Sequence, residues 1–137
     1  MRYVLGFLTG NHNSEVVLIR KTKPEWQEGF LNGVGGKIEE GEEPGDAMRR
    51  EFREEAGLDI LSWRHYATMR GPDWEVFVFR AQGDLLIRTM TEEWVDIYPI
   101  DNLHRERTLS NVPWLVAMAV DRNLAERLAE PVIIHYV

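Results

Sequence analysis

The chain has 137 residues, no cysteine and a formal net charge of −7 at neutral pH. Its length fits a single hydrophobic core, so we expect residues 1–137 to form one domain. The absence of cysteine excludes disulfide and thiolate chemistry. The acidic balance argues against binding to a nucleic acid polymer, which needs a basic surface. Residues 1–10 are too short an apolar run for a membrane span and lack a signal-peptide layout. The sequence therefore predicts a cytoplasmic protein without a membrane partner.

Short apolar and β-branched runs between turn-forming residues predict most of the strands. Strands are expected over 3–8, 16–19, part of 30–36, part of 58–69, 74–79, 85–88 and 132–136. Helices are expected over 44–56 and 113–128, with a turn or short helix starting at Pro99. Because strands and helices alternate without a repeat or a linker, the pattern indicates an α/β domain.

The two expected helices carry recognisable ends and apolar faces. Pro44 suits a first helical turn and Gly57 a C-terminal stop. The first helix is expected to bury Ala47, Met48, Phe52 and Ala56. For the second helix, we expect Ser110 or Asn111 as the N-cap. Its core-facing residues would be Trp114, Leu115 and Met118, with Leu124 and Leu128 as further candidates.

The first helix also concentrates negative charge. Glu51, Glu54 and Glu55 lie three and four positions apart, which places their carboxylates on one side within about one turn. Like charges at this spacing repel and cost stability. A hard divalent cation relieves the repulsion, and Mg²⁺ takes oxygen ligands together with waters and substrate phosphates. The cluster therefore predicts a site for phosphate chemistry.

The stretch 36–58 resembles the signature of the Nudix hydrolase family, G-x5-E-x7-R-E-U-x-E-E-x-G-U, where U is a bulky apolar residue. All nine defined positions are filled, by Gly36, Glu42, Arg50, Glu51, Phe52, Glu54, Glu55, Gly57 and Leu58. The resemblance implies the family's fold, a mixed β-sheet in an α/β/α sandwich. It also implies Mg²⁺-dependent hydrolysis of a nucleoside diphosphate linked to another group, with Mn²⁺ as a substitute metal.

The same resemblance assigns roles within the signature. Glu51, Glu54 and Glu55 would hold the metal, with the backbone carbonyl near Gly36 as a further ligand. Glu54 or Glu55 would act as general base, and the sequence leaves that choice open. Arg50 would orient a catalytic glutamate through its planar fork. Glu42 would pair with this arginine or lie near the metal, and Lys37 is either a phosphate contact or an exposed lysine.

Residues outside the signature bear on the substrate. The run 30–42 is similar to MutT-type members that cleanse nucleotide pools, in which the residue matching Asn32 touches the base. Two aspartates of a mammalian member acting on oxidised purine triphosphates fall at Ser110 and Asn111 here. We expect Asn32, Lys37, Trp74 and Asn111 to contact the substrate, with Trp26 and Trp94 as further stacking candidates and Trp63 in the core.

One further carboxylate of the family has no obvious counterpart. A glutamate that contributes an additional catalytic or metal contact in relatives is replaced here by Thr89. Glu92 or Glu93 is expected to substitute for it, the alternative being that both are plain loop residues.

Three functions are therefore compatible with the sequence. The favoured one is hydrolysis of a (deoxy)nucleoside triphosphate, including an oxidised purine nucleotide, to monophosphate and pyrophosphate. The second is cleavage of ADP-ribose, a dinucleoside polyphosphate or a nucleotide sugar. The third is a non-catalytic nucleotide-binding module, against which the intact carboxylates argue. The partner is a small-molecule nucleotide in each case, and the protein is expected to be a monomer or a homodimer.

Overall fold

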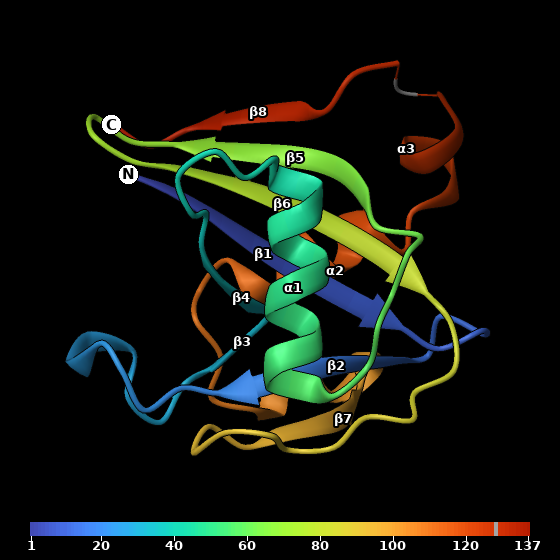
Figure 1. Cartoon of the computed structure of the whole chain (residues 1–137). Helices are drawn as coiled ribbons and strands as arrows, with labels where there is room; N and C mark the ends of the chain where they lie inside the picture. Colours follow the sequence, from blue (N-terminus) through green and yellow to red (C-terminus); the bar gives the residue numbers. More distant parts are fainter. Residues whose placement is uncertain (128) are drawn as a thin grey trace.

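The computed structural model describes residues 1–127 and 129–137. Within them, eight strands form one mixed sheet, in which β3, β2, β1, β6, β5 and β8 lie in that order (Figure 1). The strands are β1 (Arg2–Thr9), β2 (Glu15–Arg20), β3 (Leu31–Asn32), β4 (Val34–Lys37), β5 (Arg64–Arg70), β6 (Glu75–Gln82), β7 (Val95–Pro99) and β8 (Val132–His135). Strand β4 also pairs with β1, and β7 with β2. The pairs β1–β6 and β5–β8 are parallel and the others antiparallel.

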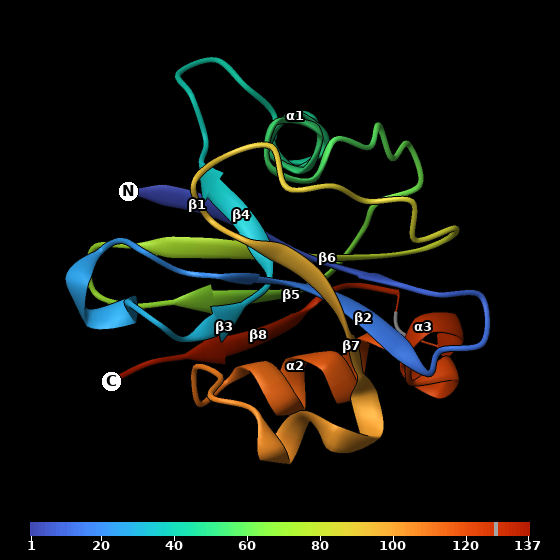
Figure 2. The same cartoon turned by 90° about the horizontal axis from the view of Figure 1, so that it is seen from below.

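Helices cover both faces of this sheet. Figure 2 shows α1 (Pro44–Ala56) on one side, and α2 (Val112–Ala119) on the other. A short helix α3 (Arg122–Arg127) follows α2, and two 3₁₀ helices, η1 (Glu25–Gln27) and η2 (Ile100–Arg105), lie in connections. The arrangement confirms the predicted α/β/α sandwich. No helix within 1–127 and 129–137 is long and apolar enough to cross a bilayer. The predicted cytoplasmic location and oligomeric state stay predictions.

Alternation along β1 divides the core into two halves. Leu5 and Phe7 point toward α2 and join a cluster that includes Leu115 and Val116. Val4 and Leu8 point the other way and pack with the apolar face of α1. Since successive strand residues face opposite sides of a sheet, one strand supports both helical layers.

Helix α1 has the predicted bounds and the predicted buried face of Ala47, Met48, Phe52 and Ala56. Pro44 occupies the first turn, and Gly57 ends the helix with φ 74°, the left-handed conformation that glycine adopts without a Cβ penalty. Trp63 packs edge-on against Phe52 with ring centroids 5.2 Å apart, as expected of a core aromatic.

The prediction of one helix over 113–128 is wrong, because the segment breaks after Ala119. Asp121 accepts hydrogen bonds from the backbone N–H groups of Asn123 (2.9 Å) and Leu124 (3.2 Å), which starts the separate helix α3. Leu128 lies outside the described residues. Asn111 is the N-cap residue of α2, but its side chain makes no capping hydrogen bond. Trp114, expected in the core, is 40% exposed, whereas Leu115 is fully buried.

The prediction of a strand over 85–88 is also wrong. The backbone N–H of Arg88 donates to the Ala56 carbonyl, and that of Met90 to the Glu55 carbonyl. These are carbonyls of the last turn of α1, which have no partner within the helix. The segment therefore satisfies the end of α1 instead of adding a strand to the sheet.

Candidate functional site

The centre of the site is where α1 crosses β4. A Cβ atom on Gly36 would lie only 2.4 Å from the carboxyl carbon of Glu51. Real Cβ atoms do not approach that closely, so the glycine is required for the helix carboxylate to rest against the strand backbone. Glycine at position 36 therefore leaves room for the Glu51 carboxylate in the position it occupies.

Arg50 connects the acidic groups around this crossing. Its guanidinium donates two hydrogen bonds to Glu42, at 2.8 and 2.9 Å. A third goes to Glu51 at 2.9 Å, a fourth to Glu54 at 3.3 Å and a fifth to the Lys37 carbonyl at 3.1 Å. The planar fork thus joins the loop before α1, the helix and the end of β4.

This network shifts the acid–base equilibria of its members. The hydrogen bond from Arg50 holds the pKa of Glu42 below its ordinary value, and the same bond raises the pKa of Arg50. Burial raises the pKa of Glu51, although contact with Arg50 opposes the shift. Glu54 lies further out, with a side chain that is 54% exposed.

Glu55 differs from its neighbours because it lacks a cationic hydrogen-bond partner. Its Oε2 atom is buried and has no hydrogen bond to the described residues. Burial raises the pKa of Glu55 to about 7, and the negative charge of Glu93 contributes in the same direction. A carboxylate with a buried oxygen and a pKa near neutrality is suited to accepting a proton or a cation.

The structure distinguishes the two candidates for the additional carboxylate. Glu92 is exposed, with only a 3.8 Å contact to Lys23. Glu93 is 3% exposed and accepts hydrogen bonds from Lys21 Nζ at 3.0 Å and from the Thr22 backbone at 2.7 Å. Burial alone would raise the pKa of Glu93, but these bonds lower it below its ordinary value. Glu93 is therefore a charged group beside Glu55.

Sequence reasoning could not choose Glu93 because the choice depends on a loop conformation. The hydroxyl of Thr89 accepts a hydrogen bond from the Val95 backbone at 3.0 Å, which closes the loop. The loop then turns Glu93 inward. The sequence shows two adjacent glutamates, Glu92 and Glu93, just before the strand β7. It does not show which of the two side chains is buried.

The four predicted substrate-binding residues lie in different places. Lys37 ends β4 and is exposed. Asn32, opposite Ile19 in the β2–β3 pair, uses its side-chain oxygen to accept from the Gly33 backbone at 2.8 Å. Within the described residues, its amide N–H groups make no hydrogen bond, which leaves two donors available.

Asn111 and Trp74 both lie on the α2 face and are connected through Met69 and Tyr136. The Asn111 amide contacts the sulfur of Met69 at 3.6 Å, and the hydroxyl of Tyr136 contacts the same sulfur at 3.6 Å. The ring of Trp74 lies 5.3 Å from that of Tyr136. The Oδ1 atom of Asn111 is buried and has no hydrogen-bond partner among the described residues. A buried acceptor without a hydrogen-bond partner is uncommon in native proteins.

A metal site is not fully assembled. Within 1–127 and 129–137, no three acidic or histidine side chains converge in the arrangement that would hold a metal ion. Glu51 and Glu54 are instead turned to Arg50. The unpartnered oxygen of Glu55 and the close backbone of Gly36 still offer hard oxygen donors, and Mg²⁺ commonly takes only one or two carboxylates beside waters and phosphates. The oxygen donors present thus fit a hard divalent cation.

Comparison with known proteins agrees with this geometry. The sequence profile of the NUDIX domain matches residues 1–117, and the chain belongs to that family. The family and the fold predicted from the sequence are confirmed. A curated zebrafish (Danio rerio) relative, 8-oxo-dGDP phosphatase NUDT18, is 33% identical over 81 residues, which cover 58% of this chain. The match spans only 25% of that relative's length.

Solved structures share the fold at low identity. A structure from work on MutT of Aliivibrio salmonicida and Vibrio cholerae superposes with a TM-score of 0.74 at 22% identity, covering 86% of this chain and 99% of that one. The NUDIX domain of Shewanella oneidensis NrtR, complexed with ADP ribose, gives a TM-score of 0.76 at 14% identity, covering 87% and 85%. These likenesses concern the fold alone.

Proposed function

We propose that the protein is a metal-dependent Nudix pyrophosphohydrolase. Its substrate would be a (deoxy)nucleoside triphosphate, including an oxidised purine nucleotide, which it would cleave to monophosphate and pyrophosphate. The observation that carries the proposal is the arrangement of α1 carboxylates around Arg50 and Gly36, with a buried unpartnered oxygen on Glu55. A binding module without catalysis would not need this costly set of clustered, partly buried acids.

The cofactor in this proposal is Mg²⁺, with Mn²⁺ as a substitute. Glu51, Glu54 and Glu55 would hold it, together with the backbone near Gly36. When bound, the metal neutralises pyrophosphate charge and acidifies a water molecule. Burial of the Glu51 and Glu55 side chains makes a cation favourable there, because it offsets the desolvation of ionised carboxylates.

Side chains of the protein would position the metal-binding carboxylates and supply the general base. Arg50 positions Glu51 and Glu54 through direct hydrogen bonds, and Glu42 fixes Arg50 through a bidentate pair. Glu55 is the favoured general base of the two candidates, because its Oε2 makes no competing hydrogen bond to the described residues. Glu93 stays ionised beside it and raises the pKa of Glu55, so the Glu55 carboxylate binds a proton more tightly than an ordinary glutamate and is a stronger base.

Substrate recognition would use both faces of the sheet. Asn111 offers a buried acceptor to a donor group on the base, and Trp74 lies in the same neighbourhood. Asn32 offers amide donors, and the Lys37 ammonium offers charge to a phosphate. The name of the zebrafish relative favours an oxidised purine nucleotide, whereas the ligand of the NrtR domain keeps ADP-ribose as a second candidate.

A hydrolysis screen tests the proposal. The panel contains normal and 8-oxidised (deoxy)nucleoside di- and triphosphates, ADP-ribose, dinucleoside polyphosphates and nucleotide sugars, each with Mg²⁺ or with chelator and with products identified. The favoured function requires metal-dependent release of monophosphate and pyrophosphate from a triphosphate. Cleavage of ADP-ribose alone would show that the proposed triphosphate substrate is wrong while the protein is a hydrolase. Absence of turnover with every substrate would contradict the proposed activity.

Variants separate the catalytic acids from neighbouring charge. Glu54→Gln and Glu55→Gln remove one carboxylate each and are expected to lower kcat by at least about a hundred-fold. Glu40→Gln removes an exposed glutamate from the preceding loop and should leave kcat unchanged. If all three variants turn over like the wild type, the assignment of the α1 acids is wrong.

A further inference from the structure

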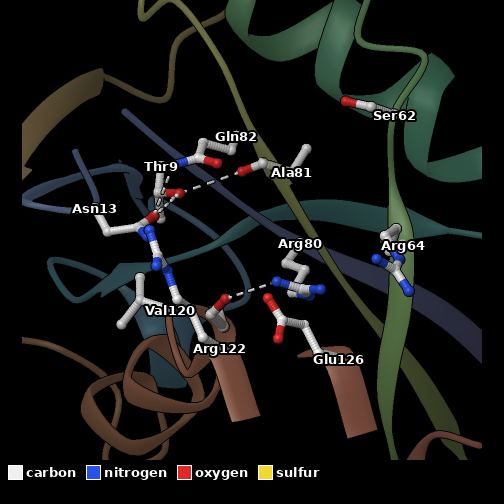
Figure 3. A pocket seen from close by; sticks show the side chains of 11 residues that line it. Thr9, Asn13, Ser62, Arg64, Arg80, Ala81, Gln82, Val120, Arg122 and Glu126 are labelled. Carbon is white, nitrogen blue, oxygen red and sulfur yellow. Dashed lines mark hydrogen bonds between the residues drawn. The ribbon is translucent and has the colours of Figure 1, made fainter. Parts of the chain in front are cut away.

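A polar cavity lies on the α2 face of the sheet, at the end of β1 and β6. Figure 3 shows the side chains that line it. Its volume is about 360 Å³. Its walls come from the ends of β1 and β6, the start of β5, and the α2–α3 region. Its polar lining includes Thr9, Asn13, Arg64, Arg80, Gln82, Arg122 and Glu126. Nothing in the proposed reaction involves them.

The charge of this cavity is opposite to that of the whole chain. Three arginines, Arg64, Arg80 and Arg122, line it together with a single carboxylate, that of Glu126. Their formal sum is +2, within a protein of net charge −7. In the described parts of the chain, none of the three arginines forms a salt bridge, whereas Arg50, Arg49 and Arg70 all do. The cavity thus gathers cations without supplying equal negative charge.

Two of these arginines are held against each other by the sheet. Arg64 and Arg80 are direct cross-strand partners in the antiparallel β5–β6 pair. Like charges at directly opposed positions destabilise a sheet. Burial lowers the pKa of Arg80, and the charge of Arg64 adds to the effect. A bound anion would relieve both costs, since it supplies the missing negative charge.

The walls of the cavity are fixed by hydrogen bonds within the protein. Arg80 Nη1 donates to the Ala119 carbonyl at 3.3 Å, which ties its guanidinium to the end of α2. The Gln82 amide donates to the carbonyls of Gly10 (3.3 Å) and Asn11 (3.1 Å) and to Asn13 Oδ1 (3.2 Å). A prearranged site loses less entropy when a ligand binds.

This cavity is separate from the carboxylate site. Gly36 lies beside Val4 of β1, whereas the cavity lies at Thr9, five residues further along the strand. At the rise of a β-strand this separates the two levels by about 17 Å. Arg80 pairs with Phe7 and faces α2, while Glu51 and the rest of α1 lie on the opposite face.

We propose that this cavity binds a small anion bearing a phosphoryl group, such as phosphate or pyrophosphate. Guanidinium forks match phosphate oxygens in bidentate geometry. The formal charge of +2 matches a phosphoryl dianion better than a single carboxylate. The volume is at the low end for ligand pockets, and the polar lining favours a compact, charged ligand over an apolar one.

The test is titration of the full chain with inorganic phosphate, pyrophosphate and citrate, at constant ionic strength. Chelator is present throughout, which prevents metal-mediated binding at α1. Binding is followed by ¹H–¹⁵N NMR and by thermal unfolding. We expect saturable shifts of the Gln82 side-chain amide and the Arg80 guanidinium with phosphate and pyrophosphate, while the Gly36 amide stays unchanged.

Arg64→Gln is the test variant and Arg105→Gln the control, because both arginines are exposed and Arg105 lies in η2, away from the cavity. Loss of one charged hydrogen-bond donor should weaken pyrophosphate binding about ten-fold or more in the first variant only. Without anion, Arg64→Gln should unfold at a higher temperature than the wild type, because the Arg64–Arg80 repulsion is gone. Addition of pyrophosphate should raise the unfolding temperature of the wild type more than that of the Arg64→Gln variant.

Three results would overturn the proposal. The first is absence of any saturable shift with phosphate or pyrophosphate. The second is equal affinity in the Arg64→Gln and Arg105→Gln variants, which would place the bound anion elsewhere. The third is citrate binding as tightly as pyrophosphate, which would show a site for anions in general without phosphoryl selectivity.

Discussion

Replacing Glu55 by glutamine should stabilise the fold while abolishing activity. The Glu55 side chain is partly buried and its pKa is raised to about 7 from an ordinary value of 4.5. At about 1.4 kcal/mol per pH unit, the full difference corresponds to roughly 3 kcal/mol. Because the Glu55 residue as a whole is only partly buried, screening by solvent reduces the expected gain to about 1–2 kcal/mol.

The sign of the pH dependence follows from proton linkage. A raised pKa in the folded state means that the folded protein binds the Glu55 proton more tightly than the unfolded chain does. The contribution of Glu55 to stability is therefore fully present below pH 4.5 and is lost as the pH rises to about 7. Glutamine does not ionise, so the advantage of the variant should grow between pH 5 and 7 and then level off.

Urea unfolding in the presence of chelator, at pH 5, 6, 7 and 8, measures this difference. Glu54→Gln is the matched control on the same helix. It loses an exposed ion pair with Arg50 and should be destabilised by about 0.3–0.5 kcal/mol or less. If Glu55→Gln is no more stable than the wild type at pH 8, or if its gain is the same at pH 5 and pH 8, the assigned environment of Glu55 is wrong.

Three further variants test the framework around the site. Arg50→Lys keeps the charge but loses the bidentate pair with Glu42, so kcat should fall about ten- to a hundred-fold. Circular dichroism checks that the variant is folded, and an unchanged kcat would contradict the positioning role of Arg50. Gly36→Ala places a methyl group against the Glu51 carboxylate and should lower kcat about a hundred-fold, and full activity would show that the crossing adjusts freely. Asp121→Ala removes the cap of α3 and should cost about 1 kcal/mol in urea unfolding with kcat unaltered.

Local sequence signals determined the bounds and the buried face of helix α1. The bounds of α1, its buried face and its glycine stop all followed from residues within that segment, since helix ends and faces depend on neighbours a few positions away. The 3.6-residue period also predicts Glu51, Glu54 and Glu55 on one side of α1, but in the described residues Glu51 and Glu54 bind Arg50 while Glu55 lies beside Glu93. The spaced signature also sufficed to predict the family and its sandwich fold.

Tertiary structure decided what depends on partners far along the chain. The apolar pattern over 85–88 fits a strand. In the structure, backbone N–H groups of residues 88 and 90 instead donate to carbonyls in the last turn of α1. The hydrophobic residues after Pro113 fit one helix. In the structure α2 ends at Ala119, and the Asp121 side chain accepts a hydrogen bond from the Asn123 backbone at the start of a new helix, α3. Sequence alone could not show that Glu93 is buried beside Glu55, because that burial requires hydrogen bonds from Lys21 and Thr22, which lie in the loop after β2, about 70 residues away along the chain. Nor could it show that Arg64 and Arg80 are paired, since strand register is set by contacts between distant segments.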